Sequence, residues 1–228
     1  MRRVLALDTS TWWGGAALVE QDGGGQCRTV VEIGVHVPDS HAARLLSWVD
    51  RLLAEAGWSR SDLDGYAASI GPGSFTGIRV SLGFLRGIAL ATSRPCQGVT
   101  TLEAVAHAHG PAEAERLVVM EAGRGQLYTA RFDPAGDPPG ELLAPGVSMR
   151  EPPDPDVFAS PAVVIPGPGT VLFGEWTGLR PVVAPASIAA AVGRLAMPRL
   201  AAGGADRHLA PLYLRPPDAV LNRRPGIE

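Results

Sequence analysis

A strand that passes through a glycine loop into a helix is the feature that most constrains the fold of this sequence. Apolar residues 66–70 predict a buried strand, and the run GPGSFTGIRV begins directly after it at Gly71. Residues 75–91 then carry apolar side chains at helical spacing. Gly71 and Gly73 therefore lie where the strand gives way to the helix, and Ser74 is predicted to be the helix N-cap. This order is typical of α/β folds.

The residues before this loop predict three strands and a helix. Short apolar runs at 4–7 and 16–19 flank a turn and indicate a hairpin, and the β-rich run 30–37 indicates a third strand. Residues 41–56 follow a helical pattern that Gly57 ends. With a strand at 97–99 and a helix at 101–109, the predicted order is βββαβαβα.

The second half repeats part of the first. Residues 117–120 are apolar, an acidic turn beginning at Glu121 follows, and residues 127–132 are apolar again. This pattern of run, acid, turn and run suggests a duplicated domain. We therefore expect an N-terminal domain at 1–109 and a smaller, proline-rich C-terminal domain at 110–228.

The end of the chain offers fewer regular elements. Residues 133–169 hold 10 of the 21 prolines, which favours turns, edge strands and loops. A helix is predicted at 187–197 and a short strand-like segment at 209–215, followed by a loose tail after Pro216.

All 20 basic residues are Arg, because the sequence contains no Lys. A P-loop nucleotidase and a Schiff-base enzyme both need a Lys, so these classes are excluded. The net charge of -3 does not favour avid, non-specific nucleic-acid binding. Cys27 and Cys96 are too few and too far apart to predict a zinc cluster or a disulfide framework. With no apolar stretch near the ~20 residues of a membrane span, we expect a cytoplasmic protein with no membrane association.

Two loops could carry chemistry. The turn formed by Asp8, Thr9, Ser10 and Thr11 offers a carboxylate and three hydroxyls, which suit a phosphate or a metal-bound nucleotide. The alternative is a turn whose side chains stabilise their own backbone. The second loop, at Gly71, Gly73 and Ser74, could cradle a phosphate at the helix start. Its glycine spacing differs from the dinucleotide fingerprint, and its Ser does not fit the G-x-S-x-G nucleophile motif.

Gly83 and Gly87 stand four residues apart on the predicted second helix. Each costs about 1 kcal/mol relative to Ala in a helix, so a packing reason is expected. They allow close approach either by another element of the same chain or by another chain.

These motifs resemble the TsaB (YeaZ) family of tRNA threonylcarbamoyladenosine biosynthesis proteins. The resemblance rests on LALDTST, on the helix led by His41, on GPGSFTGIRV with SLGFLRGIAL, on VVMEAGRGQLYTARF and on PLYLR near the end. It implies an actin-like, Hsp70-like ATPase (ribonuclease H-like) fold of duplicated βββαβα domains with a reduced second domain.

The resemblance also implies a function without catalysis by this chain. TsaB proteins pair with TsaD, the catalytic paralogue, and TsaE joins the pair, so tRNA contact is expected only through the complex. A homodimer is expected when the chain is alone. TsaD carries metal ligands spaced H-x-x-x-H, whereas this chain has His41 and Leu45 at the matching positions. No catalytic or metal residue and no required cofactor is therefore expected, although ATP or ADP could bind at an interface of the complex.

Family members dimerise through their first two helices. The residues that this implies for the homodimer or TsaD interface are Leu45, Trp48, Val49, Leu52, Val80, Gly83, Phe84, Gly87 and Ile88. The competing hypothesis is a small ATP-dependent kinase of the same fold that uses Asp8 and the loop at 71–74. The short second half argues against that hypothesis, because such kinases generally close two full domains over their substrates.

Overall fold

The computed structural model describes residues 1–37, 42–109, 115–133, 141–148, 162–164, 173–175, 182–206 and 209–214. Residues 42–43, 141–148, 162–164 and 182 are described by their backbone alone. The predicted helix start at Asp39 or Ser40, most of the proline-rich stretch and the tail after Pro216 fall outside these ranges.

The first half forms the predicted βββαβαβα order. The strands are β1 (Arg2–Asp8), β2 (Trp13–Gln21), β3 (Cys27–His36), β4 (Gly65–Ser69) and β5 (Cys96–Val99). The helices are α1 (Ala42–Ala56), α2 (Phe75–Thr92) and α3 (Thr101–Ala108), with a 3-10 turn at Arg60–Asp62. Gly57 ends α1 with φ +67°, a left-handed conformation that glycine adopts without steric cost.

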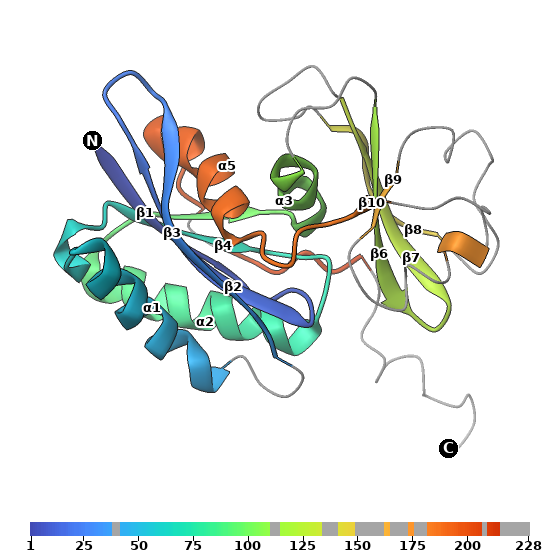
Figure 1. Ribbon diagram of the computed structural model, residues 1–228, viewed down its shortest axis with the longest axis horizontal. Coiled ribbons are helices and arrows are strands. Elements are labelled where there is room, and N and C mark those ends of the chain that lie inside the picture. The colour runs from blue at the N-terminus through green and yellow to red at the C-terminus, as the bar shows by residue number, and fades with distance from the viewer. Residues whose placement is uncertain are drawn as a thin grey trace, which may run out of the picture.

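The second half forms another five-stranded sheet. Its strands are β6 (Arg116–Gly123), β7 (Gln126–Phe132), β8 (Glu141–Ser148), β9 (Ala162–Val164) and β10 (Val182–Val183). The last helix among the described residues is α5 (Ala189–Ala201). Figure 1 shows the two sheets side by side, the first on the left and the second on the right.

The two sheets share one topology, which confirms the duplication suspected from the repeated pattern. The first sheet has the order β3-β2-β1-β4-β5 and the second the order β10-β9-β6-β7-β8. In each, the first strand pairs antiparallel with the second and parallel with the fourth. The second copy is reduced, since β9 has three residues and β10 has two.

Both faces of the first sheet are covered, as Figure 1 shows. Helices α1 and α2 pack on one face, and α5 packs on the other against all five strands. Alternation along β1 divides its side chains accordingly, because Leu5 and Leu7 join the cluster under α1 and α2, whereas Val4 and Ala6 join the cluster under α5.

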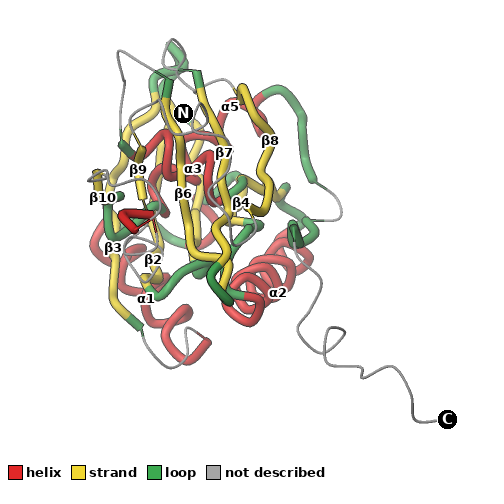
Figure 2. The backbone as a smooth tube through the Cα atoms, turned by 90° about the vertical axis from the view of Figure 1, so that its right-hand side faces the viewer, coloured by secondary structure: helices red, strands yellow, loops and turns green. Residues whose placement is uncertain are grey.

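Helix α3 lies between α5 and the second sheet. It contacts α5, β6 and β7, and Figure 2 shows it behind β6 and β7. One apolar cluster runs from Val4 of β1 through Val105 of α3 to Val118 and Phe132 of the second sheet. The two halves therefore share a continuous core.

This arrangement corrects two expectations about the end of the chain. Helix α5 and residues 209–214 return to the first domain, so the second domain does not extend from 110 to 228. The predicted strand at 209–215 is wrong for its described residues. Leu212 instead donates a single backbone hydrogen bond of 2.7 Å to Ile70, beside the glycine loop.

The contact between α5 and the sheet depends on Gly193. A Cβ atom there would lie 2.6 Å from Val19 Cγ2 and 3.2 Å from Ala6 Cβ. Gly87 of α2 is the opposite case, since an added Cβ would meet no atom within 4 Å.

Alanine at these two positions should therefore act in opposite directions. Gly193→Ala should lower the free energy of unfolding by about 1 to 2 kcal/mol, because overpacking outweighs the gain in helix propensity. Gly87→Ala should raise it by up to about 1 kcal/mol. Urea denaturation of both variants measures this difference. Equal effects of the two substitutions would contradict the packing described for α5.

Candidate functional site

The first predicted loop uses its polar groups within the chain. Asp8, at the end of β1, is 2% exposed. Its Oδ1 accepts hydrogen bonds from Ser10 N (3.0 Å), from Ser10 Oγ (2.6 Å) and from Ser69 Oγ (2.5 Å). Thr11 Oγ1 donates to the carbonyl of Trp13 at 2.9 Å and accepts from the amide of the same residue. The side chains of the turn therefore stabilise its own backbone, which was the alternative to a phosphate-binding turn in the sequence analysis.

The structure brings the two predicted loops together. Ser74 N donates to Ser10 O at 2.7 Å, and Thr9 Oγ1 donates to Gly77 O at 2.7 Å. A Cβ atom at Gly73 would lie 2.2 Å from Ser10 O, and one at Gly77 would lie 2.0 Å from Thr9 O. Both glycines are required because no larger residue permits this approach. We refer to residues 8–11 and 71–77 together as the interlocked loops.

The predicted N-cap is confirmed. Ser74 Oγ accepts a hydrogen bond of 3.1 Å from Gly77 N, and α2 begins at Phe75. Gly71 has φ +110°, and its carbonyl accepts from Thr101 N at 2.8 Å. The loop is thus tied to β1 on one side and to α3 on the other.

Ser69 is the residue of this site that the motifs did not reveal. It is fully buried at the end of β4, the parallel neighbour of β1. Because parallel strands present their carboxyl ends at the same edge of a sheet, a Ser in the last position of β4 could have been paired with Asp8.

A small hollow adjoins Asp8 between the two halves of the chain. It has an empty volume of about 240 Å³, part of it open to solvent, and it is lined by Asp8, Thr11, Trp13, Val105, Pro185, Ala186 and Ile188. Among the described residues that line it, Asp8 is the one carboxylate, and no arginine is present to neutralise a phosphate.

A metal ion would be needed to bring a nucleotide to this carboxylate. Over the described parts of the chain, no group of three or more His, Cys, Asp or Glu side chains could hold a metal ion. Leu45, at the position matching the second His of the H-x-x-x-H pair, is 1% exposed in the core, and His41 lies outside the described residues.

The ionisable groups with shifted pKa values do not line this hollow. Burial lowers the pKa of the Arg116 guanidinium, which donates a hydrogen bond to the carbonyl of Ala106. Burial and the nearby charge of Arg116 lower the pKa of His109. Burial, with Asp206 adding to it, raises the pKa of the Cys96 thiol to about 11.

The first helix presents its expected interface residues to the core of its own chain. Leu45, Trp48, Val49 and Leu52 are between 1% and 6% exposed and pack under the first sheet. The structure therefore corrects the expectation that these four side chains form a docking surface. The apolar face of an amphipathic helix was identified correctly, but this face covers the sheet.

The second helix leaves part of its expected interface exposed to solvent. An added Cβ at Gly83 or Gly87 would meet nothing within 4 Å, so neither glycine serves a contact within the described chain. Val80, Phe84 and Ile88 are half-buried beside the core. Leu90, one turn after Gly87, is 85% exposed. We refer to Val80, Gly83, Phe84, Gly87 and Ile88 as the open face of α2.

No helix among the described residues is long and apolar enough to cross a membrane.

Two related sheets that share a core, with a glycine loop between β4 and α2, define a member of the actin-like, ribonuclease H-like ATPase fold class. A profile described as TsaD, tRNA N6-adenosine threonylcarbamoyltransferase, matches residues 34–140. YeaZ from Pseudomonas aeruginosa is 30% identical and superimposes with a TM-score of 0.75, and the match covers 94% of this chain and 100% of that structure.

Similarity to curated sequences agrees with this structural match. The tRNA threonylcarbamoyladenosine biosynthesis protein TsaB of Escherichia coli is 35% identical over 132 residues, which are 57% of this chain and 54% of that protein. The match thus spans about half of the E. coli protein. An uncharacterized Mycobacterium tuberculosis protein, Rv3421c, is 31% identical over 95% of this chain and 93% of its own length. The chain belongs to the TsaB (YeaZ) family.

Removal of the buried Asp8 carboxylate should lower the stability of the fold. Asp8→Ala would leave the Ser10 and Ser69 hydroxyls without their acceptor, so the free energy of unfolding should fall by about 2 to 4 kcal/mol. Asp22→Ala is the matched control, because Asp22 Oδ1 accepts from Gly24 N and Gln26 N in an exposed turn. It should cost less than about 1 kcal/mol. Urea denaturation compares the two, and an Asp8 variant as stable as the wild type would disprove the structural role.

The thiols should differ in reactivity. Cys96 is buried with its pKa raised to about 11, whereas Cys27 is partly exposed. Iodoacetamide at about pH 8, near the ordinary thiol pKa, should modify Cys27 in the native protein and spare Cys96. Both should react in urea. Mass spectrometry of the digested protein measures the modification of each cysteine. Similar rates of modification for Cys27 and Cys96 in the native protein would contradict the burial of Cys96.

Proposed function

We propose that this chain is a non-catalytic subunit in the synthesis of threonylcarbamoyladenosine in tRNA, where it docks on a catalytic partner of the TsaD family and activates it. The family supports the pathway, because curated relatives are named for it. The open face of α2 is the observation that carries the docking role.

Helix propensity makes this face hard to explain within the chain. Gly83 and Gly87 together cost about 2 kcal/mol relative to alanine, at 1 kcal/mol each. Within the described residues, no atom approaches either position to compensate. Small residues four apart let a second helix approach closely, and half-buried Val80, Phe84 and Ile88 flank them with apolar area. Close packing of a partner helix against Gly83 and Gly87 would offset this loss of helix stability.

The interlocked loops support the absence of catalysis by this chain. The hydroxyls of Thr9, Ser10 and Thr11 all donate to groups of the chain itself. Ser10 O, which would face a ligand in an open turn, accepts from Ser74 N. The hydroxyls of this turn that could bind a phosphate are therefore engaged within the chain.

The wider assembly follows from the same proposal. A TsaE-type ATPase joins the pair in the cytoplasm, and tRNA is held chiefly by the partner, since this chain has a net charge of -3. In the absence of the partner, the open face of α2 pairs with a second copy, because an isologous contact covers both faces at once. The chain itself requires no cofactor, and any ATP or ADP binds where the subunits meet.

Leucine at position 87 tests the docking role. Gly87→Leu should preserve the fold, because the position is open, and should weaken association with the TsaD-type partner at least about tenfold, or 1.4 kcal/mol. Gly23→Leu is the matched control, since Gly23 is exposed in the β2–β3 turn and an added Cβ there also meets nothing within 4 Å. Calorimetric titration of the partner measures both affinities.

A reconstituted reaction tests the function. With TsaC, TsaD, TsaE, ATP, threonine, bicarbonate and tRNA, modification should require this chain and should fall with Gly87→Leu but not with Gly23→Leu. If the chain is dispensable and instead phosphorylates a small substrate with ATP, the kinase hypothesis replaces the docking role.

A further inference from the structure

Besides Met1 and Val183 of β10, the exposed large apolar residues among the described positions form two chemical groups. Leu46 of α1 and Leu90 of α2 are aliphatic and lie on helices. The other three, Trp12, Phe75 and Tyr213, are aromatic. Trp12 and Tyr213 lie outside helices and strands, and Phe75 is the first residue of α2. Exposed aromatic rings offer flat faces on which planar groups such as nucleic-acid bases can stack.

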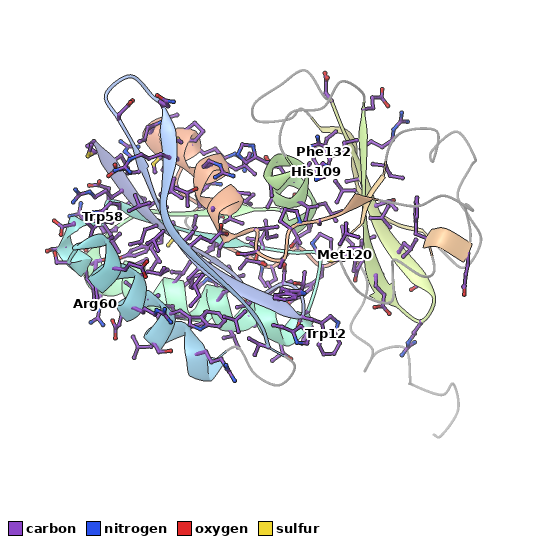
Figure 3. All side chains as sticks on the ribbon, viewed as in Figure 1. Trp12, Trp58, Arg60, His109, Met120 and Phe132 are labelled. Carbon is purple, nitrogen blue, oxygen red and sulfur yellow. The ribbon has the colours of Figure 1, made fainter. Side chains whose placement is uncertain are left out.

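The three aromatic residues are brought to this end by the interlocked loops. Trp12 follows Ser10 by two residues, and Ser10 O accepts from Ser74 N, directly before Phe75. Figure 3 shows Trp12 at the end of the first domain where α2 begins. Tyr213 is held there because Leu212 N donates to Ile70 O.

Arg79 is fixed between two of these rings. Its guanidinium carbon lies 3.6 Å from the centroid of Phe75 and 5.6 Å from that of Tyr213. Its Nε donates a hydrogen bond of 2.7 Å to Tyr213 Oη, and the two ring centroids are 5.2 Å apart. The side chain is thereby held in one position before any ligand arrives, which lowers the entropic cost of binding.

Among the described residues, no carboxylate forms an ion pair with Arg79. Its hydrogen bond to Tyr213 uses Nε. The terminal Nη groups can therefore donate to an anion. Phe75 and Tyr213 remain 40% and 42% exposed and Trp12 is 56% exposed, so ring surface is available beside that charge.

We propose that Trp12, Phe75, Arg79 and Tyr213 form a contact site for unpaired nucleotides of RNA, with Arg79 on a phosphate and the rings under the bases. Aromatic stacking combined with arginine is how proteins hold single-stranded RNA without reading its sequence. The exposed neighbours Ser74 and Thr76 are polar. The inference rests on the proposed function, because the acidic chain needs a partner to bring RNA to the site.

The test uses the complex of this chain with its TsaD-type partner and a fluorescein-labelled tRNA transcript. Fluorescence anisotropy should show Arg79→Gln weakening tRNA binding about tenfold and Phe75→Leu weakening it by a similar factor. The slope of log affinity against log salt should fall by about one for Arg79→Gln alone, as expected for one lost phosphate contact. Arg94→Gln, which removes the same charge just beyond the other end of α2, should change neither quantity.

Association with the partner separates this inference from the proposed function. Both site variants should bind the partner as the wild type does. If they do and tRNA affinity is unchanged, the inference is wrong and the docking role stands. If Arg79→Gln weakens the partner instead of the tRNA, the site is a protein interface and the inference is also wrong. If the wild-type chain does not bind the partner, the proposed function fails and the inference falls with it.

Discussion

The close approach of two backbone segments, at Ser10 against Gly73 and at Thr9 against Gly77, is the constraint on which the rest of the first domain depends. An added Cβ would lie 2.2 Å or less from a carbonyl oxygen at both glycines, so the approach exists only because these positions lack side chains. It joins the end of β1 to the start of α2. This join buries Asp8 and sets the direction in which α2 leaves the sheet. It therefore also places Phe75 and Arg79 at one end of the domain.

The same join gives the carboxylate at the end of β1 a structural role in this ATPase-type fold. Asp8 accepts hydrogen bonds from Ser10 and Ser69 and stabilises the end of the sheet. A buried carboxylate with three donors is costly to remove even when it performs no chemistry. Stability of the scaffold is therefore sufficient reason for an acid at this position.

The sequence predicted local structure well, because hydrophobic periodicity, glycines and a cap are read within one segment. The strands and helices of the first half, Ser74 as N-cap and the two separate loops were all found in this way, whereas the contact between the loops was not. Three features depend on contacts between distant segments and were missed or misassigned. These are the hydrogen bond from Ser69 to Asp8, the inward direction of Leu45 and its neighbours, and the return of α5 to the first sheet. An apolar stripe at helical spacing shows that a face is covered, but whether by its own sheet or by another chain is decided in three dimensions.

The return of α5 ties the order of protein synthesis to the order of folding. Residues 189–201 cover a face of a sheet whose strands lie between residues 2 and 99, and they approach it so closely that a Cβ added at Gly193 would lie 2.6 Å from Val19 Cγ2. When the first sheet leaves the ribosome, the helix that covers this face has not yet been made. Val4, Ala6 and Val19 therefore remain uncovered until about ninety further residues, those between the end of β5 and the start of α5, have been made. Completion of the N-terminal domain is thereby delayed until the second sheet has also been synthesised.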